Sequence, residues 1–169
     1  GEKEFLGRGV SYCATCDGHF FKGKKIAAIV NVPGALEEVD FLAELCEKVY
    51  LMPRFKIEGE LKHENIEVIA EYPDEITGTD RVTGLRTPHG YYPVNGVFIF
   101  RESDPVDSLF PDILLKGKSV AVGEEMETSV EGIFAAGDCT GHPWQISRAT
   151  GQGIVAALSA VKYLSQLKY

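Results

Sequence analysis

The sequence predicts an α/β protein built on parallel strands, and three consecutive segments carry that prediction. Residues 25–30, Lys-Ile-Ala-Ala-Ile-Val, form a short apolar run typical of a buried strand. Apolar side chains then recur at helical spacing, which predicts an amphipathic helix over about 35–47, with Pro33 suited to its first turn. Residues 49–52 form the next apolar run, and Pro53 ends it. A strand–helix–strand unit of this kind crosses over right-handedly and makes its two strands parallel.

The remaining segments extend this pattern. Further short strands are expected at 66–70, 82–87 and 96–100, with turn signals between them. From about Arg101 the chain becomes an acidic loop, and Ser103-Asp104-Pro105 marks an expected domain boundary.

The C-terminal third is expected to hold one more strand and a long helix. The strand is predicted at 132–136, directly before Gly137 and Asp138. The helix carries four apolar residues on one face, namely Ile154, Leu158, Val161 and Leu164.

Composition excludes several classes of protein. The chain has 169 residues, of which 44% are hydrophobic and 25% charged, an ordinary globular mixture. Apolar runs such as 26–30 fall far short of the about 18 residues of a membrane span. The net charge of −8 argues against nucleic acid as a partner. Four cysteines are too few for a disulfide scaffold, so we expect cytoplasmic residence and redox or metal chemistry at any C-x-x-C.

Such a pair occurs at Cys13-Ala14-Thr15-Cys16, followed at once by Asp17. At a helix start, one turn brings the two sulfurs within bonding reach, and the helix N-terminus stabilises a thiolate. Such a thiolate attacks disulfides, and its neighbour resolves the mixed disulfide. Asp17 is suited to moving the proton of that exchange, or is simply a helix-start acid.

Two other readings of the cysteines stay open on residue types alone. The pair can be a structural bridge, or it can be half of a Cys₃His zinc site completed by Cys139 and His142. Cys46, on the apolar side of its predicted helix, is interpreted as a small buried hydrophobic residue.

Two long segments resemble the low-molecular-weight thioredoxin reductases. Residues 7–18, Gly-Arg-Gly-Val-Ser-Tyr-Cys-Ala-Thr-Cys-Asp-Gly, resemble the redox segment of that family. Residues 128–138, Thr-Ser-Val-Glu-Gly-Ile-Phe-Ala-Ala-Gly-Asp, resemble its late flavin-binding signature, and 145–160 continue that signature as a helix. The resemblance extends over essentially the whole chain and is shared with members that lack NADPH motifs, such as ferredoxin-dependent flavin thioredoxin reductase.

The resemblance implies a fold and a division of the chain. Residues 1–101 would form a Rossmann-like domain of the pyridine-nucleotide type that carries the C-x-x-C. Residues 102–169 would form the C-terminal segment of an FAD-binding domain. Family members are about twice as long, and their N-terminal G-x-G-x-x-G strand–turn–helix has no counterpart here. We therefore expect this chain to be a piece of a larger, homodimeric reductase.

The resemblance also implies roles for individual residues. Cys16 would face the flavin and accept its electrons, Cys13 would attack the disulfide of a thioredoxin-like protein, and Asp17 would act as acid and base. The implied cofactor is FAD, and the residues implied to bind it are Gly137, Asp138, Gln145 and Ile146.

The nucleotide loop of the first domain departs from the family pattern. Val30 and Val32 stand where two glycines belong, and Pro33 removes an N–H from the phosphate cradle. After the second strand only Arg54 remains of a basic cluster. NADPH is therefore not expected as electron donor, and a protein donor, ferredoxin, is expected instead. The alternatives are an NADPH-dependent thioredoxin reductase that binds nucleotide in a shifted pose through Arg54 and Lys56, and a non-catalytic or zinc-binding interaction domain on a reductase scaffold.

Overall fold

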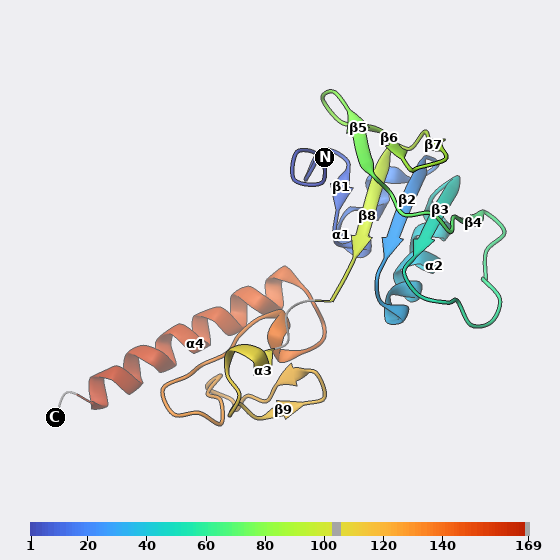
Figure 1. Ribbon diagram of the computed structural model, residues 1–169. Coiled ribbons are helices and arrows are strands. Elements are labelled where there is room, and N and C mark those ends of the chain that lie inside the picture. The colour runs from blue at the N-terminus through green and yellow to red at the C-terminus, as the bar shows by residue number, and fades with distance from the viewer. Residues whose placement is uncertain (103–105, 168–169) are drawn as a thin grey trace. The chain divides into compact units, whose positions relative to one another are not determined.

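The computed structural model describes residues 1–102 and 106–167, and the chain forms two compact units, Gly1–Glu102 and Ser103–Tyr169. The first unit contains a five-stranded sheet in the order β1-β8-β2-β3-β4, and every pairing in it is parallel (Figure 1). Its strands are β1 (Val10–Ser11), β2 (Lys25–Val30), β3 (Lys48–Pro53), β4 (Ile66–Val68) and β8 (Gly96–Phe100). The predicted α/β class with parallel strands is confirmed.

The predicted strand–helix–strand unit is the centre of this sheet. Strand β2 pairs in parallel with β3, and between them lie a 3₁₀ turn, Pro33–Ala35, and helix α2 (Leu36–Leu45). The helix is two residues shorter than predicted at its C-terminal end. Asn65 explains that end, because its Nδ2 donates to the carbonyl oxygens of Ala43 (2.9 Å) and Cys46 (3.0 Å).

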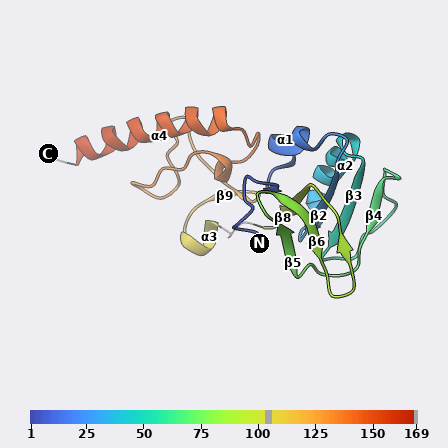
Figure 2. The same ribbon diagram turned by 90° about the horizontal axis from the view of Figure 1, so that it is seen from above.

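The two faces of the parallel sheet have different covers (Figure 2). Because side chains alternate along a strand, Ile26, Ala28 and Val30 point to one face and pack with α2. The intervening residues Ala27 and Ile29 pack on the other face against a three-stranded antiparallel sheet. That sheet consists of β5 (Glu75–Gly78), β6 (Val82–Arg86) and β7 (Tyr91–Tyr92).

The predicted strands at 82–87 and 96–100 are found with nearly these bounds, and the one at 66–70 is shorter. Strands β1, β5 and β7 were not predicted. Two of them have two residues each, too short for an alternating pattern to register.

The second unit is described over 106–167. It holds α3 (Val106–Leu109), a hairpin of β9 (Leu115–Lys116) and β10 (Ser119–Val120), and a 3₁₀ turn at Asp138–Thr140. The long helix α4 (Ile146–Gln166) follows, as predicted. The four apolar residues of its predicted face are all exposed, between 57% and 67% of their surface. The expected boundary residues Ser103, Asp104 and Pro105 lie outside the described residues.

The strand predicted at 132–136 is wrong. This segment makes only an isolated antiparallel bridge between Phe134 and Glu127. A buried strand is stabilised by ladders on its sides, and among the described residues of this unit only the 126–128 segment pairs with it. In the parts of the chain that the structure describes, no helix is long and apolar enough to cross a membrane.

Candidate functional site

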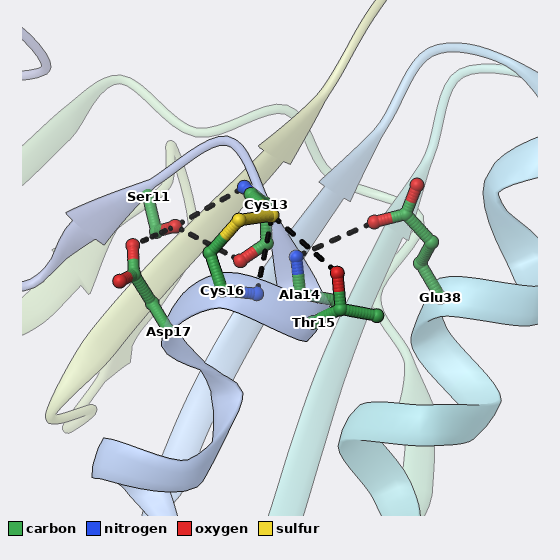
Figure 3. Close-up of a disulfide and its surroundings, with 7 residues drawn as sticks. All are labelled: Ser11, Cys13, Ala14, Thr15, Cys16, Asp17 and Glu38. Atoms are coloured by element: carbon green, nitrogen blue, oxygen red, sulfur yellow. Dashed lines mark hydrogen bonds between the residues drawn. A yellow bond between two sulfur atoms is a disulfide. The ribbon is translucent and has the colours of Figure 1, made fainter. Parts of the chain in front are cut away.

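The two cysteines of the C-x-x-C are joined in a disulfide. The bond Cys13–Cys16 spans a Cα–Cα distance of 5.3 Å (Figure 3). Cys13 is the N-cap of the one-turn helix α1 (Ala14–Asp17), and its Sγ accepts the backbone N–H of Cys16 at 3.1 Å. Cys13 is half-buried and Cys16 is exposed. The oxidised pair therefore lies at the surface, where an exchange partner can reach it.

The turn formed by residues 13–17, which carries the disulfide and is called the redox turn below, is held between the parallel sheet and α2. Strand β1 leads into it and pairs with β8, where Ser11 lies opposite Phe98. Behind the turn, Ala14 is fully buried, and the N–H of Ala14 donates to Glu38 Oε2 of α2 at 3.4 Å. Gly18 follows at a crowded position, because an added Cβ would lie 3.1 Å from Leu42 Cδ2 of α2, closer than an ordinary van der Waals contact. The sheet and helix thus fix the position of the disulfide.

A serine hydroxyl connects Asp17 to the disulfide segment. Ser11 Oγ donates to Asp17 Oδ2 at 2.6 Å and accepts the backbone N–H of Cys13 at 3.1 Å (Figure 3). Sequence reasoning singled out Asp17 but missed Ser11 and Glu38. The spacing of Ser11 two residues before Cys13 was visible in the motif, but nothing in it indicated a bond to Asp17.

Asp17 also lines a pocket of about 510 Å³. Its wall includes Ser11 and the aromatic residues Phe20 and Phe21. Three cationic side chains contribute to the same wall, namely Arg8, Lys24 and Arg81. Asp17 therefore borders this pocket as well as the hydroxyl of Ser11.

A second polar cluster adjoins the redox turn at Tyr12. Tyr12 Oη donates to Glu2 Oε1 at 2.7 Å, and Arg101 forms an ion pair with the same oxygen. The hydrogen bond from Tyr12 is the main cause that lowers the pKa of Glu2, with Arg101 adding to it and partial burial opposing it. The same hydrogen bond raises the pKa of Tyr12.

The predicted flavin-binding residues lie together at the turn before α4. Gly137 is buried at a φ of 84°, a conformation that favours glycine, and its N–H donates to Gln152 Oε1 at 2.9 Å. Asp138 is exposed at the start of the 3₁₀ turn. Gln145 is the N-cap of α4 but caps no N–H with its side chain, and Ile146 begins the helix with 84% of its surface exposed.

Arg148 stabilises this turn from within α4. Its guanidinium donates to the carbonyl oxygen of Gly141 at 2.5 Å and to Thr140 Oγ1 at 3.0 Å. Thr140 Oγ1, which has one hydrogen to donate, lies 2.8 Å from Gly137 O and 3.0 Å from Gln152 Oε1. An uncapped helix start beside a rigid turn offers free N–H groups to anionic or carbonyl oxygens, which fits a flavin nucleotide.

The nucleotide-type loop between β2 and α2 has few amide groups to offer. Asn31 N–H donates to Phe100 O at 2.8 Å, and Ala35 N–H donates to Val32 O at 3.1 Å. Leu36 N–H bonds Pro33 O, and Pro33 itself has no N–H. Val30 is fully buried in the core facing α2. The Val30 side chain therefore fills the core, and its expected obstruction of a phosphate stays a prediction.

Arg54 and Lys56 line a shallow pocket of about 840 Å³ after β3. The guanidinium of Arg54 stacks on the ring of Tyr72, 3.7 Å from its centroid. Both cations are exposed.

The zinc alternative combined Cys13 and Cys16 with Cys139 and His142, which belong to the other unit. Cys13 and Cys16 are bonded to each other, and over 1–102 and 106–167 no three His, Cys, Asp or Glu side chains gather where they could hold a metal ion. Cys46 is buried, as interpreted from the sequence, and burial raises the pKa of its thiol to about 11.

Comparisons with known proteins agree with this geometry. The thioredoxin reductase of Aquifex aeolicus is 38% identical over 187 residues, covering 99% of this chain and 58% of that protein. The crystal structure of a ferredoxin-flavin thioredoxin reductase from Clostridium acetobutylicum is 44% identical, with a TM-score of 0.61, and the match covers 99% of this chain and 58% of that one. The crystal structure of the thioredoxin reductase from Streptococcus pyogenes is 28% identical, with a TM-score of 0.79. That match covers 97% of this chain and 60% of the other.

The chain thus spans about 58–60% of the length of these relatives. The resemblance to thioredoxin reductases noted in the sequence is confirmed. The model of one family, the pyridine nucleotide-disulphide oxidoreductases, matches residues 1–153. With this match, the parallel sheet and the Cys13–Cys16 disulfide, the chain belongs to the pyridine nucleotide-disulphide oxidoreductase family.

Proposed function

We propose that this chain is the disulfide-bearing part of a flavin-dependent disulfide oxidoreductase of the thioredoxin reductase type. The observation that carries the proposal is the surface disulfide Cys13–Cys16, in which Cys13 is the N-cap of α1 and Cys16 is followed directly by Asp17. The similarity to thioredoxin reductases over 99% of the chain supports it. The proposed substrate is the disulfide of a thioredoxin-like protein.

In the reduced state, Cys13 is the proposed attacking thiolate. A bond forms between Cys13 Sγ and one substrate sulfur, and the other substrate sulfur leaves as a thiolate. Cys16 then attacks Cys13 Sγ, which restores the disulfide and releases the second substrate thiolate. Asp17 takes the proton from the attacking thiol and returns it to a leaving sulfur. The dithiol is thereby oxidised by two electrons, and the substrate disulfide is reduced.

A trapping experiment on the complete protein tests the order of the two cysteines. With Cys16→Ser, the mixed disulfide between Cys13 and a thioredoxin-like protein should accumulate, because no thiol remains to resolve it. With Cys13→Ser the complex should be scarce. Residue exposure alone favours the opposite order, since Cys16 is the more exposed residue in the oxidised state. A complex that forms only with Cys13→Ser would therefore reverse the assignment.

FAD is the proposed cofactor, and when bound it supplies the two electrons that reduce the disulfide. Asp138 is proposed to accept hydrogen bonds from the ribityl–phosphate portion of FAD. Gly137, at a φ of 84°, allows the backbone to turn directly before Asp138. The backbone N–H of Ile146 at the start of α4 and the side chain of Gln145 are proposed to meet the flavin ring, because the N–H of Gln145 already donates to Pro143 O at 3.0 Å. In the complete protein, Asp138→Ala should lower the flavin content measured by visible absorption, whereas Asp112→Ala, an exposed acid outside this turn, should not.

The proposed electron donor is a reduced ferredoxin, with NADPH excluded from productive binding. Of the loop amides from 31 to 36, at most those of Val32 and Gly34 remain for a phosphate, since the others donate within the chain or are absent at Pro33. Losing charge-assisted hydrogen bonds at roughly 1.5–3 kcal/mol each lowers nucleotide affinity by orders of magnitude. A relative 44% identical to this chain is a ferredoxin-flavin thioredoxin reductase.

Anaerobic titration of the complete flavoprotein decides the donor. Stoichiometric NADPH should leave the oxidised-flavin absorption unchanged, and reduced ferredoxin should bleach it. Prompt bleaching by NADPH would favour the second candidate, an NADPH-dependent enzyme that uses the cations Arg54 and Lys56 beside the 840 Å³ pocket. In that case Arg54→Ala should raise the NADPH concentration needed for bleaching. A homodimeric complete enzyme and cytoplasmic residence stay predictions from the sequence.

A further inference from the structure

Ser11 is among the few buried polar side chains of the described residues, and the proposed chemistry has not yet used it. Only 4% of its surface is exposed. It lies at the end of β1, where pairing with Phe98 of β8 fixes its backbone. A buried hydroxyl loses hydrogen bonds to water, so its protein partners determine what it does.

The partners of this hydroxyl lie on both sides of it. Ser11 Oγ has one hydrogen, and the distance of 2.6 Å to Asp17 Oδ2 assigns that hydrogen to the carboxylate. The 3.3 Å contact with Cys13 O is longer and competes for the same hydrogen. The lone pairs of Ser11 Oγ accept the backbone N–H of Cys13 at 3.1 Å. One hydroxyl thus links the carboxylate to the backbone of the first cysteine.

The link restrains Asp17 in a way that its own helix cannot. Helix α1 has four residues, and Asp17 is its last, so the helix alone leaves the side chain free to turn toward solvent. Figure 3 shows Ser11 and Asp17 together on one side of the disulfide and Glu38 on the other side. A hydrogen bond to one carboxylate oxygen holds that orientation and leaves the second oxygen for a proton.

We propose that Ser11 is a positioning residue, which holds the Asp17 carboxylate in place for proton transfer with the Cys13–Cys16 dithiol. The proposal rests on the acid–base role proposed for Asp17. Ser11 itself exchanges no proton with substrate. It acts by keeping one oxygen of the Asp17 carboxylate bound, which fixes where that carboxylate lies relative to the dithiol.

The reaction of the reduced 169-residue chain with a small aromatic disulfide, dithiobis(nitrobenzoate), isolates this step. Cys13 Sγ attacks the probe and one nitrothiobenzoate leaves; Cys16 then attacks Cys13 Sγ and the second nitrothiobenzoate leaves. The dithiol is oxidised and the probe is reduced, with coloured product as readout. This leaving group needs no acid, so the rate reports deprotonation of the attacking thiol. Because Cys139 is also exposed, all proteins carry Cys139→Ser.

Ser11→Ala should lower the rate about tenfold near pH 6, the size expected for a hydrogen bond to a charged group. The deficit should disappear above about pH 9, where the thiol ionises without a base. Ser11→Thr, which keeps the hydroxyl on a residue that favours strands, should restore the rate. Thr87→Val is the matched control, because Thr87 is also 4% exposed and bonds its hydroxyl to Gly90, in another loop.

A double variant separates positioning from general loss of structure. If Ser11 acts through Asp17, Ser11→Ala should have no further effect in the Asp17→Asn background. If Asp17→Asn leaves the pH profile unchanged, the acid–base proposal itself fails. If Asp17→Asn shifts the profile and Ser11→Ala does not, or if the two effects simply add, only the positioning role of Ser11 is overturned.

Discussion

The ring of Phe21 covers the Cα of Gly96 so closely that an added Cβ on Gly96 would lie 2.3 Å from Phe21 Cε1. Phe21 ends the 3₁₀ segment Gly18–Phe21 that follows the redox turn, and Gly96 begins β8. The same ring meets Phe98 edge-on, with 5.3 Å between centroids. The segment after the disulfide is thus anchored on the parallel sheet by one aromatic side chain.

Gly96→Ala should therefore destabilise the first unit. The new methyl group must displace the Phe21 ring, and overpacking of this kind costs about 1–3 kcal/mol of the free energy of unfolding. Urea denaturation followed by circular dichroism measures the loss. Gly34→Ala is the control, since a Cβ there meets nothing within 4 Å. Equal midpoints for the two variants would contradict the anchoring contact.

Asn65→Ala should also lower the free energy of unfolding. Its Nδ2 satisfies two carbonyl oxygens at the end of α2, those of Ala43 and Cys46, and buried acceptors left unpaired cost about 1–3 kcal/mol. The exposed Asn95 gives the comparison, because Asn95→Ala removes the same amide from the surface. Native-state hydrogen exchange should show the loss first in the last turn of α2. Unchanged protection there would argue that water replaces the side chain.

The Glu2–Tyr12 hydrogen bond predicts a pH dependence of stability. The pKa of Glu2 in the folded chain lies below its ordinary value, chiefly through Tyr12. A carboxyl of lowered pKa stabilises the fold above its unfolded pKa, and that stability is lost as the pH falls through the folded pKa. Tyr12→Phe should make the urea midpoint fall less between about pH 5 and pH 3. The variant Glu60→Gln removes an exposed acid elsewhere and should leave the slope unchanged.

Thiol labelling should distinguish all four cysteines. In the native oxidised chain at pH 8 (about the value where ordinary thiols begin to ionise) iodoacetamide should modify only the exposed Cys139. Mild reduction should add Cys13 and Cys16, whereas Cys46 should react only after unfolding because burial raises its pKa to about 11. Mass spectrometry of tryptic peptides counts the labels. Early labelling of Cys46 would show that its helix opens locally.

The strand–helix–strand unit was predictable because its apolar pattern is determined by burial on both faces of a sheet. Ile26 packs toward α2 and Ala27 toward the antiparallel sheet, yet both are fully buried. The strand sequence is therefore continuously apolar and does not alternate between apolar and polar residues. The segment 132–136 has the same apolar character and forms no strand. A hydrophobic run favours burial, but a strand also requires a neighbouring strand to pair with, and that neighbour depends on the whole fold.

At the candidate site, the sequence motif predicted the disulfide chemistry but not its support. Cys13, Cys16 and Asp17 are adjacent in the chain, so their proximity needs no tertiary structure. Ser11 and Glu38 reach the same turn through strand pairing and helix packing, which a short motif does not encode. The pairing of Glu2 with Arg101 was unpredictable for the same reason, since 99 positions separate the two residues.

That long-range pair has an architectural consequence. Glu2 and Arg101 stand near the first and last residues of the unit Gly1–Glu102, so the backbone enters and leaves the unit at one place. A module closed in this way can be spliced into a surface turn of a host protein without stretching either connection. The redox turn, its sheet and α2 thus form a module that protein engineers could transplant as one piece. The Glu2–Arg101 ion pair holds the two ends of that module together.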